Sequence, residues 1–122
     1  MTLNTPNMLS IKLERLFCYV TQERKQDEIL LKYNGKRLWP ENKYSVSIAQ
    51  DKSVDLNVSI DHIADGQEIL LELWEHDTLS ANDLLGRFIV LADKPGGPFK
   101  TDIIKNPYEK EKVKYTLQWK LE

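Results

Sequence analysis

Apolar and polar residues alternate along nearly the whole of this chain, and few folds are compatible with that pattern. The clearest case is residues 113–121, where Val, Tyr, Leu, Trp and Leu alternate with Lys, Thr, Gln and Lys. Residues 54–60 alternate in the same way, and residues 69–74 do so up to the start of a polar segment. A period of two residues places the apolar side chains on one face of an extended strand. The pattern therefore predicts half-buried strands.

Weaker patterns predict further strands at residues 11–20, 28–33, 36–39, 44–48, 84–91 and 99–104. The first should contain a bulge, because its apolar register shifts around Glu14 and Arg15. Asn34-Gly35 predicts a type I′ turn, in which both central residues have positive φ. Residues 95–98 and 106–107 combine Pro with Gly or Asn and predict loops. About eight short strands joined by turns indicate an all-β fold, an eight-stranded antiparallel β-sandwich.

The size and composition fit one domain with a core of its own. The chain has 122 residues, of which 41% are hydrophobic. A domain of this size buries roughly two thirds of the surface that its unfolded chain exposes. We expect residues 1–9 to be an N-terminal extension and residues 10–122 to form the domain. Cys18 is the single cysteine, so we expect a buried thiol and no internal disulfide.

The charge balance argues against a nucleic-acid partner, and the sequence shows no segment that would target the protein to export or to a membrane. The chain has 17 basic and 19 acidic residues and a formal net charge of −2. Proteins that bind nucleic acid normally have an excess of basic residues, so no nucleic-acid partner is expected. Residues 1–8 resemble no signal peptide, and no apolar stretch is long enough to span a membrane. We therefore expect a soluble, cytoplasmic protein that is at most peripheral to a membrane.

The densest group of polar residues lies between two predicted strands, in residues 74–86. Glu75, Asp77 and Asp83 converge if this loop folds back on itself. Ca²⁺ accepts six to eight oxygen ligands from flexible loops of this kind. The alternative is a solvated loop whose acids point apart, and spacing alone favours that alternative because acidic loops are common.

The same segment resembles the third calcium-binding loop of C2 domains. The family pattern there is an apolar strand, then D-x-D-x-x-x-x-x-D, two apolar residues and a glycine. Glu75, Asp77 and Asp83 fall on the three acidic positions, and Gly86 falls on the glycine. The resemblance implies an eight-stranded antiparallel sandwich of about this length.

Two further segments extend the resemblance over most of the chain, from about Ser10 to the C-terminus. Residues 27–36 resemble the C2 segment that follows the first loop, and residues 114–121 resemble the closing strand. The resemblance implies a Ca²⁺ site formed by Asp27, Glu75, Asp77 and Asp83, with Glu23 as a fifth candidate acid.

The chain departs from the C2 pattern at three positions. Glu75 stands where Asp is usual, Glu28 replaces a proline, and Thr21 stands where the first loop supplies another acid. Many C2 domains have lost calcium binding through such changes. Weak Ca²⁺ binding and a metal-free loop therefore both stay open.

The resemblance also implies docking to anionic phospholipid, with Ca²⁺ bridging the loops and the headgroups. Leu79 occupies the tip of the third loop, and Arg24 and Lys25 lie on the first loop. Basic residues near an anionic surface contribute about 1 kcal/mol each, so this set supports only weak membrane binding. Ordinary loop surface is the favoured interpretation of these three residues.

The sequence contains no recognisable catalytic motif. His62 and His76 are its only histidines, and a lone loop histidine is more often solvated than catalytic. We expect a non-enzymatic protein without a small-molecule substrate. The leading hypothesis is a C2-like module that binds Ca²⁺ weakly and docks to anionic phospholipid or to a protein. The alternatives are a metal-free adaptor that binds only proteins and a carbohydrate-binding sandwich that uses Trp39, Trp74 or Trp119.

Overall fold

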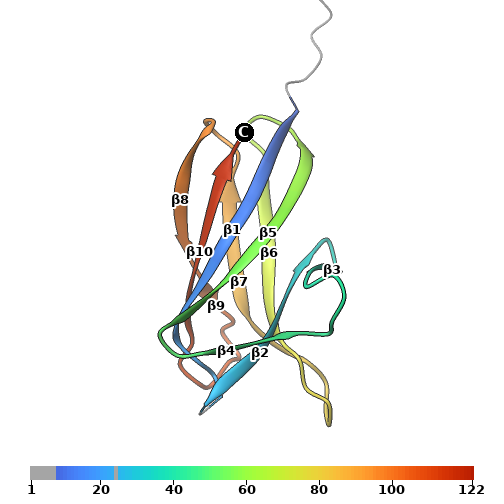
Figure 1. Cartoon of the computed structure of the whole chain (residues 1–122), viewed down its shortest axis with the longest axis vertical. Coiled ribbons are helices and arrows are strands. Elements are labelled where there is room, and N and C mark those ends of the chain that lie inside the picture. Colours follow the sequence, from blue (N-terminus) through green and yellow to red (C-terminus); the bar gives the residue numbers. More distant parts are fainter. Residues whose placement is uncertain (1–7, 24) are drawn as a thin grey trace, which may run out of the picture.

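The computed structural model of the protein describes residues 8–23 and 25–122. This part of the chain contains strands and turns and no helix, as Figure 1 shows. The strands are β1 (Leu9–Val20), β2 (Gln26–Tyr33), β3 (Lys36–Trp39), β4 (Val46–Ala49), β5 (Lys52–Ile63), β6 (Glu68–Glu75), β7 (Asp83–Leu91), β8 (Gly96–Asp102), β9 (Ile104–Lys105) and β10 (Lys114–Leu121). Within the same residues, no helix is long and apolar enough to cross a membrane.

The strands form two antiparallel sheets that pack face to face. The first sheet has the order β5-β1-β10-β8, and the second has the order β3-β2-β6-β7-β9, with β4 also pairing with β2. Alternate side chains of both sheets point inward, and Leu13, Leu73 and Leu117 are among the buried members of one continuous core. The predicted antiparallel β-sandwich is confirmed.

The described residues form ten strands where about eight were expected, and the segment expected at residues 99–104 is divided into β8 and β9. β3 and β4 pair with successive stretches of β2, and Pro40, which has no backbone N–H to donate, directly follows β3. β8 and β9 are separated only by Ile103, where the chain passes from the first sheet to the second.

Two local predictions are confirmed. The pairing of β1 shifts between Leu13 and Arg15 against both of its neighbours, so the bulge lies where the apolar register slips. Asn34 and Gly35 have φ values of 52° and 76°, as their hairpin turn requires.

The loop predicted at residues 95–98 is wrong in part, because strand β8 begins at Gly96. Gly97 lies close against β10: a Cβ added to it would lie 2.9 Å from the Cβ of Lys120. Its φ of 120° also favours glycine. The residues that indicate a loop in the sequence therefore form an edge strand that lies against β10.

The ends of the strands bring three connections to one end of the sandwich. The β1–β2 and β6–β7 connections both lie at the end opposite the C-terminus (Figure 1). The backbone N–H of His76, just after β6, donates to the carbonyl of Glu28 in β2 at 2.7 Å. The β3–β4 connection joins them, since Ser45 lines the same hollow as His76. We call this region the loop end.

Candidate functional site

Asp27 lies at the start of β2 and is fully buried at the loop end. One of its carboxyl oxygens accepts the backbone N–H of Glu23 at 2.8 Å. The other accepts the N–H of Gln22 at 3.0 Å and the hydroxyl of Tyr115. Burial and the neighbouring Asp27 raise the pKa of Tyr115 far above its usual range, so its hydroxyl remains a donor. Asp27 thus ties the β1–β2 connection to β10 and has no exposed surface.

Glu75 ends β6 and points to the same inward side as Leu71 and Leu73. Only 4% of it is exposed, and its Oε2 atom has no hydrogen-bond partner in the described part of the chain. Burial, the largest cause, together with Asp27 and Glu23, raises the pKa of Glu75 to about 9. The Glu75 carboxyl is therefore protonated at neutral pH.

Asp77 is engaged within its own loop. Its two carboxylate oxygens accept the N–H of Leu79 and the hydroxyl of Ser80, each at 2.8 Å. These hydrogen bonds lower the pKa of Asp77, because they favour its charged form. Asp83 is exposed at the start of β7, as the cross-strand partner of Glu75. Asp77 therefore stabilises the conformation of the β6–β7 loop, and Asp83 lies where this loop ends.

A hollow of about 400 Å³ opens beside these residues at the loop end. It is lined by Glu23, Gln26, Glu28, Ser45, Glu75, His76, Asp77 and Thr78. The imidazole of His76 stacks on the ring of Tyr44, with 5.4 Å between the ring centroids and 9° between the planes. Tyr44 was expected within a strand, but it lies in the connection before β4, where its ring can reach His76.

Glu28, Tyr44 and His76 carry no sequence pattern that predicts them as members of one site. The two stacked rings are 32 residues apart (76 − 44 = 32), and neither belongs to a motif. Only the fold brings them together. The one signal in the sequence was indirect, since Glu28 replaces the proline of the C2 pattern.

Comparison with known proteins resolves the fold. No protein-family model matches the chain, and no curated protein matches its sequence. Among solved structures, the first C2 domain (domain A) of plant extended synaptotagmin 1 matches with a TM-score of 0.51 and 12% identity, covering 96% of this chain and 97% of that domain. The chain has the C2 fold. Another solved C2 domain matches with a TM-score of 0.48 and 16% identity, covering 93% of this chain and 96% of the other.

Two of the acids expected to hold Ca²⁺, Asp27 and Glu75, are not placed as ionised ligands open to a metal ion. Across the described residues, no group of three or more His, Cys, Asp or Glu side chains is placed to hold a metal ion. Asp27 is buried and its carboxyl oxygens accept three hydrogen bonds, and Glu75 is buried and protonated. A Ca²⁺ site needs ionised oxygens that converge on a shared point. Asp27 and Glu75 do come close together, but both are buried, and Glu23 beside them is exposed.

The expected contact residues of the C2 loops are placed as loop surface. Leu79 is 95% exposed at the tip of the β6–β7 connection, and Lys25 is exposed on the β1–β2 connection. Arg24, predicted beside it, lies outside the described residues. Their role in contact with a membrane or a partner stays a prediction.

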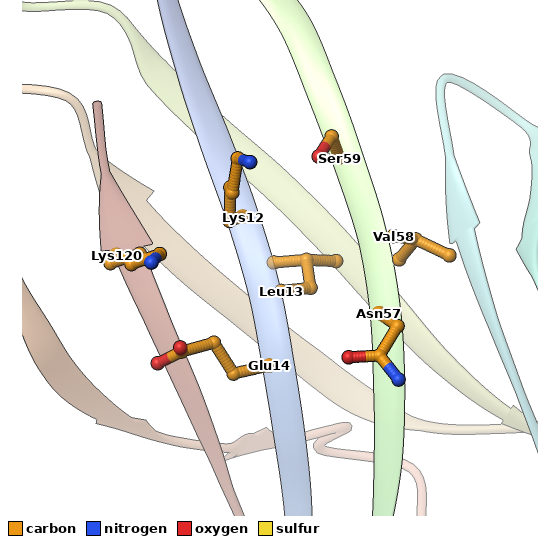
Figure 2. A pocket seen from close by; sticks show the side chains of 7 residues that line it. All are labelled: Lys12, Leu13, Glu14, Asn57, Val58, Ser59 and Lys120. Atoms are coloured by element: carbon orange, nitrogen blue, oxygen red, sulfur yellow. The ribbon is translucent and has the colours of Figure 1, made fainter.

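A second hollow lies on the outer face of the four-stranded sheet of this C2 fold. Figure 2 shows its lining, which comes from β1, β5 and β10. Lys12 and Lys120 lie there, but both ammonium groups pair with Glu122, at 3.4 Å and 3.0 Å. Both ammonium groups share the single side-chain carboxylate of Glu122, and Glu14 adds a further acid to the lining, so the second hollow is a poor site for an anion.

The tryptophans do not form a carbohydrate platform on this C2 fold. Trp39 and Trp119 are buried in the core. Trp74 is half-buried, and the ammonium of Lys32 lies 4.5 Å from its ring centroid. A sugar-binding platform needs an exposed, unobstructed ring, so the carbohydrate hypothesis loses its support.

Proposed function

We propose that this chain is a non-catalytic binding module that recognises a partner protein through the loop end, without calcium. The observation that carries the proposal is the buried pair of Asp27 and Glu75. In a calcium-dependent loop these positions would present ionised oxygens to the metal. Here the carboxyl oxygens of Asp27 are buried and accept hydrogen bonds from Gln22, Glu23 and Tyr115.

The reactive side chains of the chain support a non-catalytic role. Burial raises the pKa of Cys18 to about 11, so its thiolate is scarcely populated at neutral pH. His76 is stacked on Tyr44, and His62 lies in β5 on the other sheet. Neither histidine has a hydrogen-bonded carboxylate partner in the described residues, as a general base usually does.

The charge of the loop end favours a protein over an anionic membrane. Glu23, Glu28 and Asp77 line the hollow beside the exposed Leu79. Acidic side chains are repelled by anionic phospholipid, and one apolar tip residue offers little insertion. We expect the module to act in a reducing compartment such as the cytoplasm, in line with its single buried thiol.

A calcium titration tests the proposal. We expect no heat by calorimetry and no change in melting temperature at millimolar Ca²⁺. A ligand at a hundredfold excess over its Kd would add about 2.7 kcal/mol to the free energy of unfolding, which is several degrees in a domain of this size.

Two variants show whether any effect of Ca²⁺ arises at the expected site. Asp77→Asn changes an acid of the expected site, and Asp93→Asn changes an exposed acid beyond the far end of β7. A melting shift of several degrees with Ca²⁺ that Asp77→Asn abolishes and Asp93→Asn keeps would contradict the calcium-free function.

A further inference from the structure

We propose that the hollow at the loop end is a pocket for a basic side chain, in the first place an arginine, presented by a partner protein. This inference rests on the proposed function and names the chemistry of its partner. Three features of the hollow carry it: its charge, an unsatisfied buried acceptor and an aromatic wall.

Four of the eight residues that line the hollow are acids, and one of these, Glu75, is neutral because its carboxyl is protonated at neutral pH. Glu23, Glu28, Glu75 and Asp77 reach it from the β1–β2 connection, from β2 and from the segment that ends β6. None of its lining residues in the described chain is a lysine or an arginine. Because several acids face one concave space without a basic neighbour in its lining, the site favours a cation.

The second feature is the buried acceptor of Glu75. Its Oε2 atom has no donor in the described residues, although only 4% of the residue is exposed. Buried acceptors are normally satisfied, so an unsatisfied one points to a missing donor. A carboxyl group retains acceptor capacity in either protonation state, and a guanidinium offers five N–H donors and no acceptor.

The third feature is the stacked pair of His76 and Tyr44. His76 lines the hollow, and Tyr44, which is 73% exposed, lies nearly parallel to it. Arg37 and Tyr44 line a neighbouring hollow, where the guanidinium carbon of Arg37 lies 6.0 Å from the centroid of the Tyr44 ring, so the aromatic face toward this hollow is that of His76. Planar guanidinium groups stack on aromatic rings, so this wall suits arginine better than lysine.

The same features argue against the other cations that such a hollow could attract. A divalent metal needs a convergent set of acids, and the described residues hold none. The quaternary ammonium of a choline lipid has no N–H, so it would leave Glu75 Oε2 without a donor. An arginine meets all three features at once.

A titration of the full chain by heteronuclear NMR tests this inference. The probe is N-acetyl-arginine amide at millimolar concentration, with N-acetyl-citrulline amide as the uncharged match of similar shape. We expect arginine to shift the amide signals of residues 23, 26, 28, 45 and 75–78, and citrulline to leave them in place. N-acetyl-lysine amide should bind more weakly than arginine.

Substitutions at the rim supply the matched controls. Removing one partly exposed charge, by Glu23→Gln or Glu28→Gln, should weaken arginine binding about threefold to fivefold. Asp93→Asn, at the far end of the sandwich, should leave it unchanged, and the melting temperature of each variant shows that it is folded.

Three results would overturn the inference: no shifts with arginine, equal shifts with citrulline, or shifts that map elsewhere on the chain. Glycerophosphocholine shifting these signals where arginine does not would replace the protein partner with a lipid headgroup. If neither N-acetyl-arginine amide nor Ca²⁺ binds, the inference about an arginine pocket is wrong, and the proposed calcium-free binding function still stands. The calcium titration tests the proposed function separately, because Ca²⁺ binding would contradict that function whatever the arginine result.

Discussion

Among single residues, Glu75 is the acid with the most altered chemistry at the loop end, because its carboxyl is buried. Its side chain is longer than that of aspartate by one methylene group, and its carboxyl lies buried at the end of β6 beside Asp27. Burial of a carboxyl disfavours its charged form, which accounts for most of the raised pKa. The position that resembles a calcium ligand therefore holds a neutral acid at neutral pH.

This residue predicts a pH dependence of stability. The pKa of Glu75 is about 9 in the folded chain and 4.5 ordinarily, so the folded state binds the proton more tightly. The contribution is fully present below about pH 4.5 and is lost as the pH rises through about 9, by about 1.4 kcal/mol per pH unit at most. Glu75→Gln cannot ionise and should gain stability relative to the wild type between pH 5 and pH 8, measured by urea unfolding.

The matched control is Glu68→Gln, an exposed acid at the start of the same strand. It should follow the wild type over this pH range. A Glu75→Gln variant whose unfolding free energy runs parallel to that of the wild type from pH 5 to pH 8 would contradict the raised pKa.

Among the strands, β9 joins the six-stranded sheet because of Gly86. Gly86 of β7 pairs with Lys105 of β9, the neighbouring strand at the edge of this sheet. A Cβ on Gly86 would lie 2.4 Å from the carbonyl oxygen of Ile104 and 2.8 Å from the side chain of Ile103. The glycine of the recognised motif is thus required by the close approach of a neighbouring strand.

Gly86→Ala should destabilise the fold, because the first obstacle is backbone and cannot move aside cheaply. Overpacking of this kind costs about 1–3 kcal/mol, which thermal unfolding will measure as a lower melting temperature. Ser53→Ala, at an exposed position of β5, is the control and should change little. Equal melting temperatures for the two variants would show that β9 does not pack against Gly86 in this way.

Over the molecule as a whole, the C2 fold places all three loop-end connections on one side and leaves the basic residues dispersed. Lys12 and Lys120 pair with Glu122 on the four-stranded sheet, and Arg15 pairs with Asp55. The net charge is −2. A single exposed Leu79 beside an acidic hollow is a weak membrane anchor.

Liposome co-sedimentation tests this charge distribution. We expect equal, low sedimentation with phosphatidylserine-rich and with pure phosphatidylcholine liposomes at low salt, because the acidic loop end gains nothing from an anionic surface. Leu79→Asp, which removes the apolar tip, should behave as the wild type. Phosphatidylserine-dependent sedimentation that falls with salt and is lost in Leu79→Asp would restore membrane docking.

Local patterns were enough to predict much of the fold. The strand at residues 113–121, the bulge before Arg15 and the turn at Asn34-Gly35 were predicted correctly. Each of them depends on residues that are close together along the chain. The start of β8 at Gly96 was missed, since its glycines indicate a loop until β10 lies against them. Sequence patterns record local preferences, and this strand depends on a distant partner.

The candidate site divides in the same way. The resemblance to C2 domains pointed to Glu23, Glu75 and Asp77 at the loop end, whereas Glu28, which also lines the hollow there, was not predicted. The protonation and hydrogen bonding of the loop-end residues depend on the folded molecule: Tyr115, 88 residues from Asp27, donates to it, and Tyr44 stacks on His76. The packing of the two sheets buries the Glu75 carboxyl, and this burial raises its pKa. The spacing of residues along the chain does not determine how deeply a side chain is buried.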